Sequence, residues 1–361
     1  MFNTVKNHYE SYPYPTYPLI ASVNRSDTYA LNLTSLWARF NDSLPPSEAK
    51  KILIAGCGTF APYPWSVANP DIPITALDLS DKSLLRAARH CRLHLCNNII
   101  YRCGDLTDGH FADSSFGLID SFGVLHHLEN PLAGLKALEK LLVPGGILRI
   151  MVYSRYARKE EESIRRSLRL LGIKTPEKAR ALFKRAATGS RLENYLSRAD
   201  EPATRSGLAD ALLHPRVRTF RINDLKEMVD LTNLEILMFA HYNALEKPSE
   251  EIERIRSLEK ERYSDDNFIL YLGKKGESPV AECRERVIIL NPCLRSSVSR
   301  LKFGKTVIAS RLGVQNPTLH SGERDFLRRF TTPVRTGTLS VNELERVAVY
   351  KRLLFLIDYP T

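Results

Sequence analysis

The sequence predicts an α/β protein built on a mostly parallel sheet. Short apolar segments predict strands at residues 51–55, 74–78, 98–102, 117–122 and 147–153. Helical patterns at 83–95 and 131–142 lie between them. Strands that alternate with helices form βαβ units, whose strands run parallel. Ligands of such sheets bind beyond the carboxyl ends of the strands, so we expect a site in the loops that follow them.

Composition places the chain among ordinary globular proteins. It has 361 residues and a net charge of +11, and its apolar runs are far shorter than the roughly 20 residues that a membrane helix needs. The first residues, MFNTVKNHYESYPYP, contain no apolar region typical of a secretory signal. Six cysteines are scattered without paired spacing. We therefore expect a reduced, cytoplasmic protein with no membrane partner.

The order of the elements divides the chain into three parts. Residues 1–50 hold an aromatic segment, interpreted as a lid, and a helix. Residues 51–277 hold the sheet, with closing strands at 234–240 and 268–272 and a helical insertion at about 155–215. A linker is predicted at 274–279. The extension at 278–361 is mainly helical, with a strand at 286–290 and helices at 321–330 and 340–356 that could form a winged-helix-like module.

Positive charge is concentrated in the insertion and the extension. Residues 155–198 contain 13 basic and 5 acidic residues, and residues 278–361 contain 14 and 7. Basic segments attract anions such as nucleic acid, phosphate or carboxylate ligands. A solvated helix face is the alternative interpretation, because the basic residues of the insertion recur at nearly every helical spacing.

A small-residue loop follows the first strand directly, in the sequence AGCGTFA at 55–61. Gly56 and Gly58 would let the backbone approach a bound nucleotide closely. Asp78 ends the second strand, at a spacing that suits hydrogen bonds from two ribose hydroxyls. Asp105 follows the third strand, where a carboxylate can accept a hydrogen bond from an adenine amino group. Alternatives remain: a plain turn, a helix cap at Asp78, a loop acid at Asp105, or NAD as the nucleotide.

Taken together, these motifs resemble class I S-adenosylmethionine-dependent methyltransferases. The resemblance rests on ILIAGCGT, DLS at 78–80, GVLHHL at 123–128 and PGG at 144–146. YPYP at 12–15 and YSRYAR at 153–158 are similar to a bacterial subgroup often fused to tetratricopeptide repeats, although this chain shows no such repeats. The resemblance covers roughly residues 9–275, and Phe60 departs from it, since many members carry a third glycine there.

The resemblance implies a Rossmann-like seven-stranded sheet whose last strand is antiparallel, with S-adenosylmethionine as the cofactor. The residues expected to bind this cofactor come from the loops after the first four strands: Gly56, Cys57, Gly58, Asp78, Leu79, Asp105, Leu106 and Gly123.

Two adjacent histidines follow the fourth strand. Neighbouring side chains on an extended segment point to opposite faces, so His126 and His127 cannot easily chelate one metal ion, and we expect none. We expect one to face the site as a base or orienting group and the other to pack; a structural role for both is the alternative. Tyr153 is a further catalytic candidate.

The candidate substrate-binding residues are Tyr12, Tyr14 and Arg158. The two tyrosines belong to a stiff aromatic and proline segment that could close over the cofactor or pack against a helix. Arg158 could hold a carboxylate or phosphate by a forked pair of hydrogen bonds. Its alternative is a solvated arginine at a helix start.

The resulting functional hypothesis is methyl transfer by SN2 displacement to a small-molecule acceptor, a reaction that needs alignment more than a catalytic motif. A protein or RNA methyltransferase that docks its substrate on the basic segments is the first alternative. A non-catalytic cofactor-binding regulator is the second. A nicotinamide-dependent oxidoreductase would account for the glycines and Asp78 but not for Asp105. The oligomeric state and the acceptor atom remain open.

Overall fold

One large sheet organises the chain. The computed structural model describes residues 2–109, 111–274, 285–302 and 304–360, and seven strands of this part form the sheet order β3-β2-β1-β4-β5-β7-β6. β1 to β5 run parallel, whereas β7 is antiparallel to both β5 and β6. This confirms the predicted Rossmann-like sheet. The strands are β1 (Ile52–Ala55), β2 (Ile74–Asp78), β3 (Ile99–Cys103), β4 (Phe116–Phe122), β5 (Leu142–Val152), β6 (Leu234–Phe239) and β7 (Phe268–Lys274).

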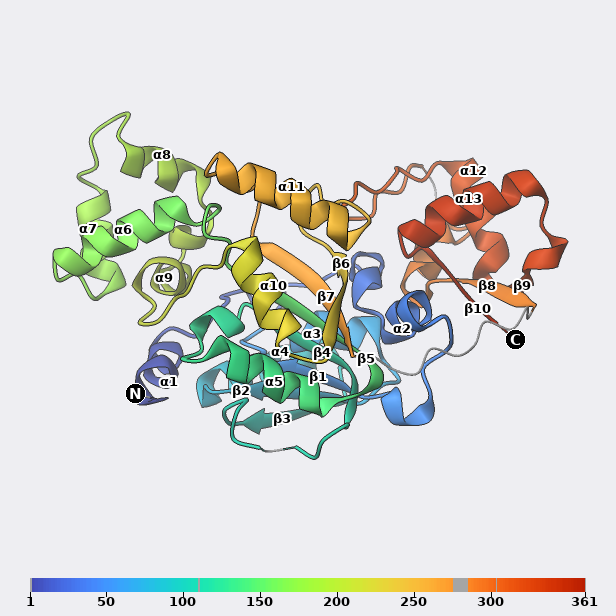
Figure 1. Cartoon of the computed structure of the whole chain (residues 1–361), viewed down its shortest axis with the longest axis horizontal. Coiled ribbons are helices and arrows are strands. Elements are labelled where there is room, and N and C mark those ends of the chain that lie inside the picture. Colours follow the sequence, from blue (N-terminus) through green and yellow to red (C-terminus); the bar gives the residue numbers. More distant parts are fainter. Residues whose placement is uncertain (1, 110, 275–284, 303, 361) are drawn as a thin grey trace.

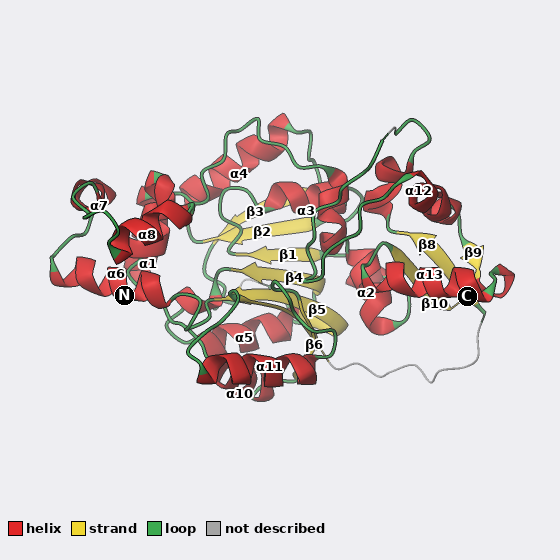
Figure 2. Cartoon of the chain, turned by 90° about the horizontal axis from the view of Figure 1, so that it is seen from above, coloured by secondary structure: helices red, strands yellow, loops and turns green. Residues whose placement is uncertain are grey.

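The two faces of the sheet are buried against different helices (Figure 2). Ile52 and Ile54 of β1 join one hydrophobic core, and Leu53 and Ala55 join the other, because successive side chains of a strand point to opposite faces. Helices α3 (Pro62–Ala68) and α4 (Asp81–Leu93) cover one face. The other face is covered by α5 (Pro131–Leu141), α10 (Ile222–Asp230) and α11 (Pro248–Lys260).

The insertion after β5 folds as a small helical unit with a core of its own. It consists of α6 (Lys159–Leu170), α7 (Pro176–Phe183), α8 (Arg191–Arg198), α9 (Arg205–Leu208) and a π-helical turn at Ala209–Leu213. Leu168, Ala179 and Tyr195 are buried together in it. The unit lies at one end of the sheet, beside the N-terminal helix α1 (Phe2–Ser11) (Figure 1).

The C-terminal extension lies at the opposite end of the molecule (Figure 1). Its described strands β8 (Arg286–Leu290), β9 (Val334–Arg335) and β10 (Leu356–Pro360) form an antiparallel sheet in the order β10-β8-β9. Helices α12 (Ser321–Arg328) and α13 (Val341–Arg352) pack with it. The predicted strand at 286–290 and helix starts near 321 and 340 are therefore present. Of the predicted linker, only Lys274 lies within the described residues.

The last helix is shorter than the sequence predicts. It ends at Arg352 and not at residue 356, because Leu354 takes a left-handed backbone conformation (φ 59°) and residues from Leu356 onward pair with β8. Residues 353–357 are all apolar, and a continuous apolar run fits a buried helix as well as a buried strand. The spacing of apolar residues therefore cannot distinguish the two here.

The extension shares a core with the segment that precedes the first strand. Tyr29 lies in a 3₁₀ turn (Arg25–Leu31) before α2 (Leu33–Asn41), and its ring meets that of Phe355 edge-on at 5.4 Å between centroids. Asn291 is fully buried and its Nδ2 donates to the carbonyl oxygens of Tyr29 (3.1 Å) and Leu354 (2.9 Å). The extension is therefore packed on the sheet domain through this segment. Within the described residues, no helix is both long and apolar enough to span a bilayer.

Replacing Phe355 with alanine tests this shared core. Phe355 is fully buried, so we expect Phe355→Ala to lower the free energy of unfolding by about 3–5 kcal/mol in urea denaturation. Leu301→Ala is the control in the same extension, because Leu301 is 84% exposed and should change stability little. A loss below about 1 kcal/mol for Phe355→Ala would contradict a continuous core.

Candidate active site

A cavity of about 1590 Å³ opens where the parallel strands of the sheet end. Its wall combines the loops after β1 to β4 with the N-terminal segment and the insertion. Most residues singled out in the sequence meet here. The predicted residues that line it are Tyr14, Gly56, Cys57, Gly58, Asp78, Leu79, Asp105, Leu106, Gly123, His127 and Tyr153. His126, Tyr12 and Arg158 lie outside its lining.

The glycine loop is in contact with the aromatic N-terminal segment. Gly58 has a left-handed φ of 54°, and a Cβ at this position would lie 2.6 Å from the carbonyl oxygen of Tyr14. The same carbonyl accepts a hydrogen bond of 3.1 Å from the Thr59 amide, and the Thr59 hydroxyl donates to the carbonyl of Pro15. Only glycine allows this approach. Residues 14 and 15 thus lie directly on the loop, with Tyr14 in the cavity wall.

Two carboxylates stand at the ends of neighbouring strands. Asp78 accepts hydrogen bonds from the amides of Gly58 (2.8 Å) and Ser80 (2.9 Å). Burial raises its pKa to about 6, although these amide donors work in the opposite direction. Ser80, not Asp78, caps α4 through its hydroxyl. Asp105 accepts from the amide and hydroxyl of Thr107 at 2.7 and 2.6 Å. Both acids can accept further hydrogen bonds from a ligand in the cavity.

The two histidines have different surroundings. His126 is fully buried, and its ring stacks on Tyr153 with 3.7 Å between the ring centres. His127 lines the cavity, and its Nδ1 lies 2.8 Å from the carbonyl oxygen of Arg216, which fixes Nδ1 as the protonated nitrogen. Burial lowers the pKa of His127 to about 3, so this ring is neutral. His127 is accordingly the one that faces the site.

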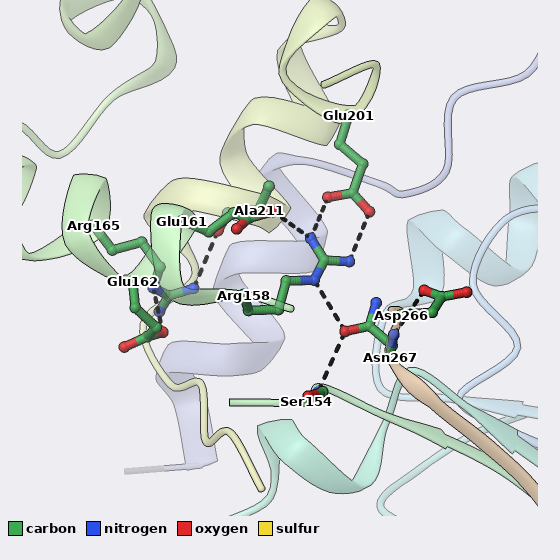
Figure 3. Close-up of polar contacts among 9 residues, drawn as sticks. All are labelled: Ser154, Arg158, Glu161, Glu162, Arg165, Glu201, Ala211, Asp266 and Asn267. Atoms are coloured by element: carbon green, nitrogen blue, oxygen red, sulfur yellow. Dashed lines mark hydrogen bonds and ion pairs between the residues drawn. The ribbon is translucent and has the colours of Figure 1, made fainter. Parts of the chain in front are cut away.

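Arg158 is held by protein groups (Figure 3). Its Nη1 and Nη2 donate to the two carboxylate oxygens of Glu201 at 2.8 and 3.2 Å, and its Nε donates to Asn267 Oδ1 at 3.2 Å. The guanidinium also lies 4.2 Å from the centre of the Tyr153 ring. A forked pair does form, but its partner is Glu201 of the insertion. Tyr12, the other predicted substrate-binding residue that lies outside the cavity, packs under the guanidinium of Arg205.

The cavity also contains two acidic groups that the sequence did not point to, Asp210 and Glu201. Asp210 belongs to the π-helical turn, is 6% exposed, and accepts a hydrogen bond of 3.0 Å from the Tyr9 hydroxyl. Asp210, Glu201 and Tyr9 all line the cavity. Burial raises the pKa of Asp210 to about 7. One feature of the sequence could have indicated Asp210: it is the single acidic residue in the otherwise apolar run LADALL at 208–213.

Replacing Gly58 with alanine would have two effects: a clash of the new Cβ with Tyr14 and strain from the left-handed backbone. A comparison with Gly172 separates them. Gly172 has a similar φ of 65° but no atom within 4 Å of its would-be Cβ. Gly58→Ala and Gly172→Ala should therefore share the cost of a left-handed alanine, but only Gly58→Ala should push residues 14–15 off the loop. We expect at least ten-fold faster hydrogen exchange of the Thr59 amide in Gly58→Ala alone. Equal exchange in the two variants would contradict the contact.

The pKa of Asp210 predicts a pH-dependent stability change. An aspartate titrates near 3.9 in the unfolded chain, so between about pH 4 and 7 the folded protein binds the additional proton, and stability is lost as pH rises through this window. Asp210→Asn abolishes this loss. The thermal midpoint of Asp210→Asn minus that of wild type should therefore increase from pH 4 to pH 7 and stay constant above pH 7. Any other effect of the substitution on stability adds the same amount at every pH. If the pKa of Asp210 were ordinary, the difference between Asp210→Asn and wild type would instead be independent of pH.

Comparison with known proteins agrees with this geometry. Residues 53–150 match the family described as a methyltransferase domain. An uncharacterized protein from Synechococcus is 29% identical over 246 residues, which are 64% of this chain and 58% of that protein. The 27-O-demethylrifamycin SV methyltransferase of Amycolatopsis mediterranei is 25% identical over 116 residues, or 32% of this chain and 43% of that enzyme. The chain thus spans less than two thirds of these curated relatives.

Solved structures share the fold over nearly the whole chain. PKMT2 from Rickettsia typhi superimposes with a TM-score of 0.53 at 15% identity, covering 96% of this chain and 77% of that one. PKMT2 has also been solved in complex with AdoHcy, with the same TM-score. Together with the sheet order, these findings show that the chain has the Rossmann-like fold of class I methyltransferases, and that residues 53–150 are similar to a methyltransferase domain.

Proposed function

We propose that this chain is an S-adenosylmethionine-dependent methyltransferase that acts on a small-molecule acceptor. The observation that carries the proposal is one continuous cavity, which joins the glycine loop, Asp78 and Asp105 to a second group of residues around Tyr153 and Asp210. The first group has the features of a nucleoside site, and the second is large enough and polar enough to take an acceptor. The match of residues 53–150 to a methyltransferase domain supports the same assignment.

The residues present fit S-adenosylmethionine. The left-handed glycines at 56 and 58 have no Cβ at these two positions of the loop, and Asp78 and Asp105 offer carboxylate oxygens at the ends of adjacent strands. These groups would hold the ribose and adenine parts. The bound cofactor supplies a methyl group on a sulfonium, and the chain has to bring the acceptor into line with it and exclude water. Tyr14, lying on the glycine loop, contributes to that exclusion.

A small acceptor fits the walls of the second group better than RNA does. Tyr9 and Tyr14 cover it from the N-terminal segment, and Asp210 and Glu201 from the insertion. Moreover, part of the insertion's positive charge is neutralised internally: Arg158, Arg165 and Arg198 each pair with a glutamate. This weakens the electrostatic attraction that phosphate backbones require. A protein side chain that enters the cavity from outside is the second candidate, because it would meet the same walls.

Calorimetry tests the cofactor assignment. We expect S-adenosylmethionine to bind and NAD not to bind. Asp78→Ala should weaken S-adenosylmethionine binding at least ten-fold, since the hydrogen bonds to the cofactor hydroxyls are lost. Asp71→Ala, an exposed acid before β2, is the control and should leave affinity unchanged. Absence of binding, or an affinity that is indifferent to Asp78→Ala, would refute the assignment.

Methyl transfer into a fractionated cell extract tests the acceptor class. Radiolabel from S-adenosylmethionine should appear in the small-molecule fraction. Label confined to protein or to RNA would show that the acceptor is macromolecular. Cofactor binding without label in any fraction would favour the non-catalytic, regulatory alternative.

A further inference from the structure

We propose that the acceptor atom is the nitrogen of a primary or secondary amine and that Asp210 removes its proton before methyl transfer. This inference rests on the proposed function and specifies the substrate class of the same site. Its basis is a juxtaposition within the cavity: a buried carboxylate without a cationic partner among the described residues faces a wall built from three tyrosine side chains, Tyr9, Tyr14 and Tyr153.

Asp210 differs from two other acids of the cavity wall, Glu201 and Asp120. The carboxylate of Glu201 is paired with Arg158, and that of Asp120 with Arg149 at 3.2 Å. Asp210 has one hydrogen bond, from the Tyr9 hydroxyl, and no ion pair with any residue that the structure describes. Burying a carboxylate without a cation is costly. A cationic ligand that enters the cavity would relieve this cost, and an ammonium group is the commonest cation of that kind on a small molecule.

The π-helical turn is a second, independent feature of Asp210. This turn directly follows α9 and places the Asp210 side chain in the cavity wall. Single π-turns are rare and are often found at functional sites, because they cost backbone hydrogen-bond geometry. The turn is retained here within a run of apolar residues that otherwise pack into the core of the insertion, such as Leu208 and Leu212. The irregular turn therefore coincides with the one acid of that run.

The aromatic wall favours a cation over an anion. The faces of aromatic rings attract ammonium groups within about 6 Å. The Tyr153 ring is already covered by the His126 ring at 3.7 Å and by the Arg158 guanidinium at 4.2 Å, so this attraction falls to Tyr9 and Tyr14. Burial raises the pKa values of Tyr9, Tyr14 and Tyr153, so all three rings stay neutral. Burial also keeps His127 neutral by lowering its pKa. Of the two acids that the insertion contributes to this wall, Glu201 is paired with Arg158, so the Asp210 carboxylate is the one left to a cationic acceptor.

The proton transfer is balanced without any further reagent. The ammonium group gives one proton to the Asp210 carboxylate, which becomes a neutral carboxylic acid, and the nitrogen recovers its lone pair. That pair forms the new N–C bond as the C–S bond breaks, and the bonding electrons of the C–S bond remain on sulfur. The methylated nitrogen is again cationic. Asp210 returns its proton to solvent when the products leave.

The charged groups around Asp210 define its pH response. Tyr9 on α1 donates a hydrogen bond, Glu201 adds a like charge, and Arg158 and Arg165 act in the opposite sense through space. Burial outweighs them and raises the pKa of Asp210 to about 7. Only the ionised form can accept a proton, so kcat/KM, which reports the ionisations of the free protein, should rise with pH through about 7 and level off above it.

Chemical blocking of amines tests the acceptor class directly in a mixture of metabolites. A cell extract is treated with acetic anhydride and then with hydroxylamine, which restores acetylated hydroxyls; the mock sample receives hydrolysed reagent. Radiolabelled methyl transfer should fall at least ten-fold in the blocked extract. Equal labelling of both extracts overturns the inference while leaving the proposed function intact. No label in either extract, although S-adenosylmethionine binds, would remove the proposed function and the inference together.

Variants test the role of Asp210. Asp210→Asn should lower kcat about 100-fold or more, in the range of general-base catalysis, while changing S-adenosylmethionine affinity less than two-fold. Asp200→Asn, in the same insertion but exposed, should leave kcat unchanged. Retention of kcat within three-fold in Asp210→Asn would overturn the assignment.

A second variant keeps the test valid if Asp210→Asn folds poorly. The Tyr9 hydroxyl hydrogen bond lowers the pKa of Asp210, so Tyr9→Phe should move the midpoint of the kcat/KM profile to higher pH. A purely structural role for Tyr9 would change the size of kcat/KM without moving this midpoint, and an unmoved midpoint would contradict the role of Asp210 as the base.

Discussion

Parallel strands bring their carboxyl ends to one edge of a sheet, and this constraint determines where the cavity forms and where its nucleoside side lies. The strand ends themselves supply backbone and carboxylate groups, at Gly58, Asp78 and Asp105. The position of each group is set by the end of a strand: Gly58 follows β1, Asp78 ends β2 and Asp105 follows β3. If the sheet were the whole domain, however, this edge would be exposed to solvent. An SN2 displacement needs a site that encloses and aligns the reactants, so further segments have to cover the edge.

Two segments remote from each other in the sequence enclose that edge. The N-terminal segment is held by the carbonyl of Tyr14, which approaches Gly58 more closely than a side chain would allow. The insertion is tied to the sheet through Arg158, which pairs with Glu201 and donates from Nε to Asn267, the residue before β7 (Figure 3). The two segments meet at the hydrogen bond between Tyr9 and Asp210. Closure and acceptor chemistry therefore depend on the same contact, so conditions that loosen it should affect both.

The sheet and its glycine loop could be predicted because they are local patterns. Apolar runs located the strands of the sheet domain, and the spacing from Gly58 to Asp78 reflects a single βαβ unit. The acceptor side could not be predicted in this way. Asp210 is 132 residues from Asp78 in sequence and is brought to it by packing of the insertion, which no periodicity reports. A forked pair of hydrogen bonds from Arg158 could be predicted. Its partner Glu201 could not, because it is also brought into place by the packing of the insertion.

The central claim is that one cavity holds the nucleoside at Asp78 and directs the methyl group toward Asp210. A crystal structure of the full chain with S-adenosylhomocysteine measures this directly. The account predicts ribose hydroxyls within about 3.2 Å of the Asp78 carboxylate, with the sulfur on the side of the cavity that Tyr153 and Asp210 line. A nucleoside bound away from Asp78, or a sulfur that points out of the cavity to solvent, would contradict it.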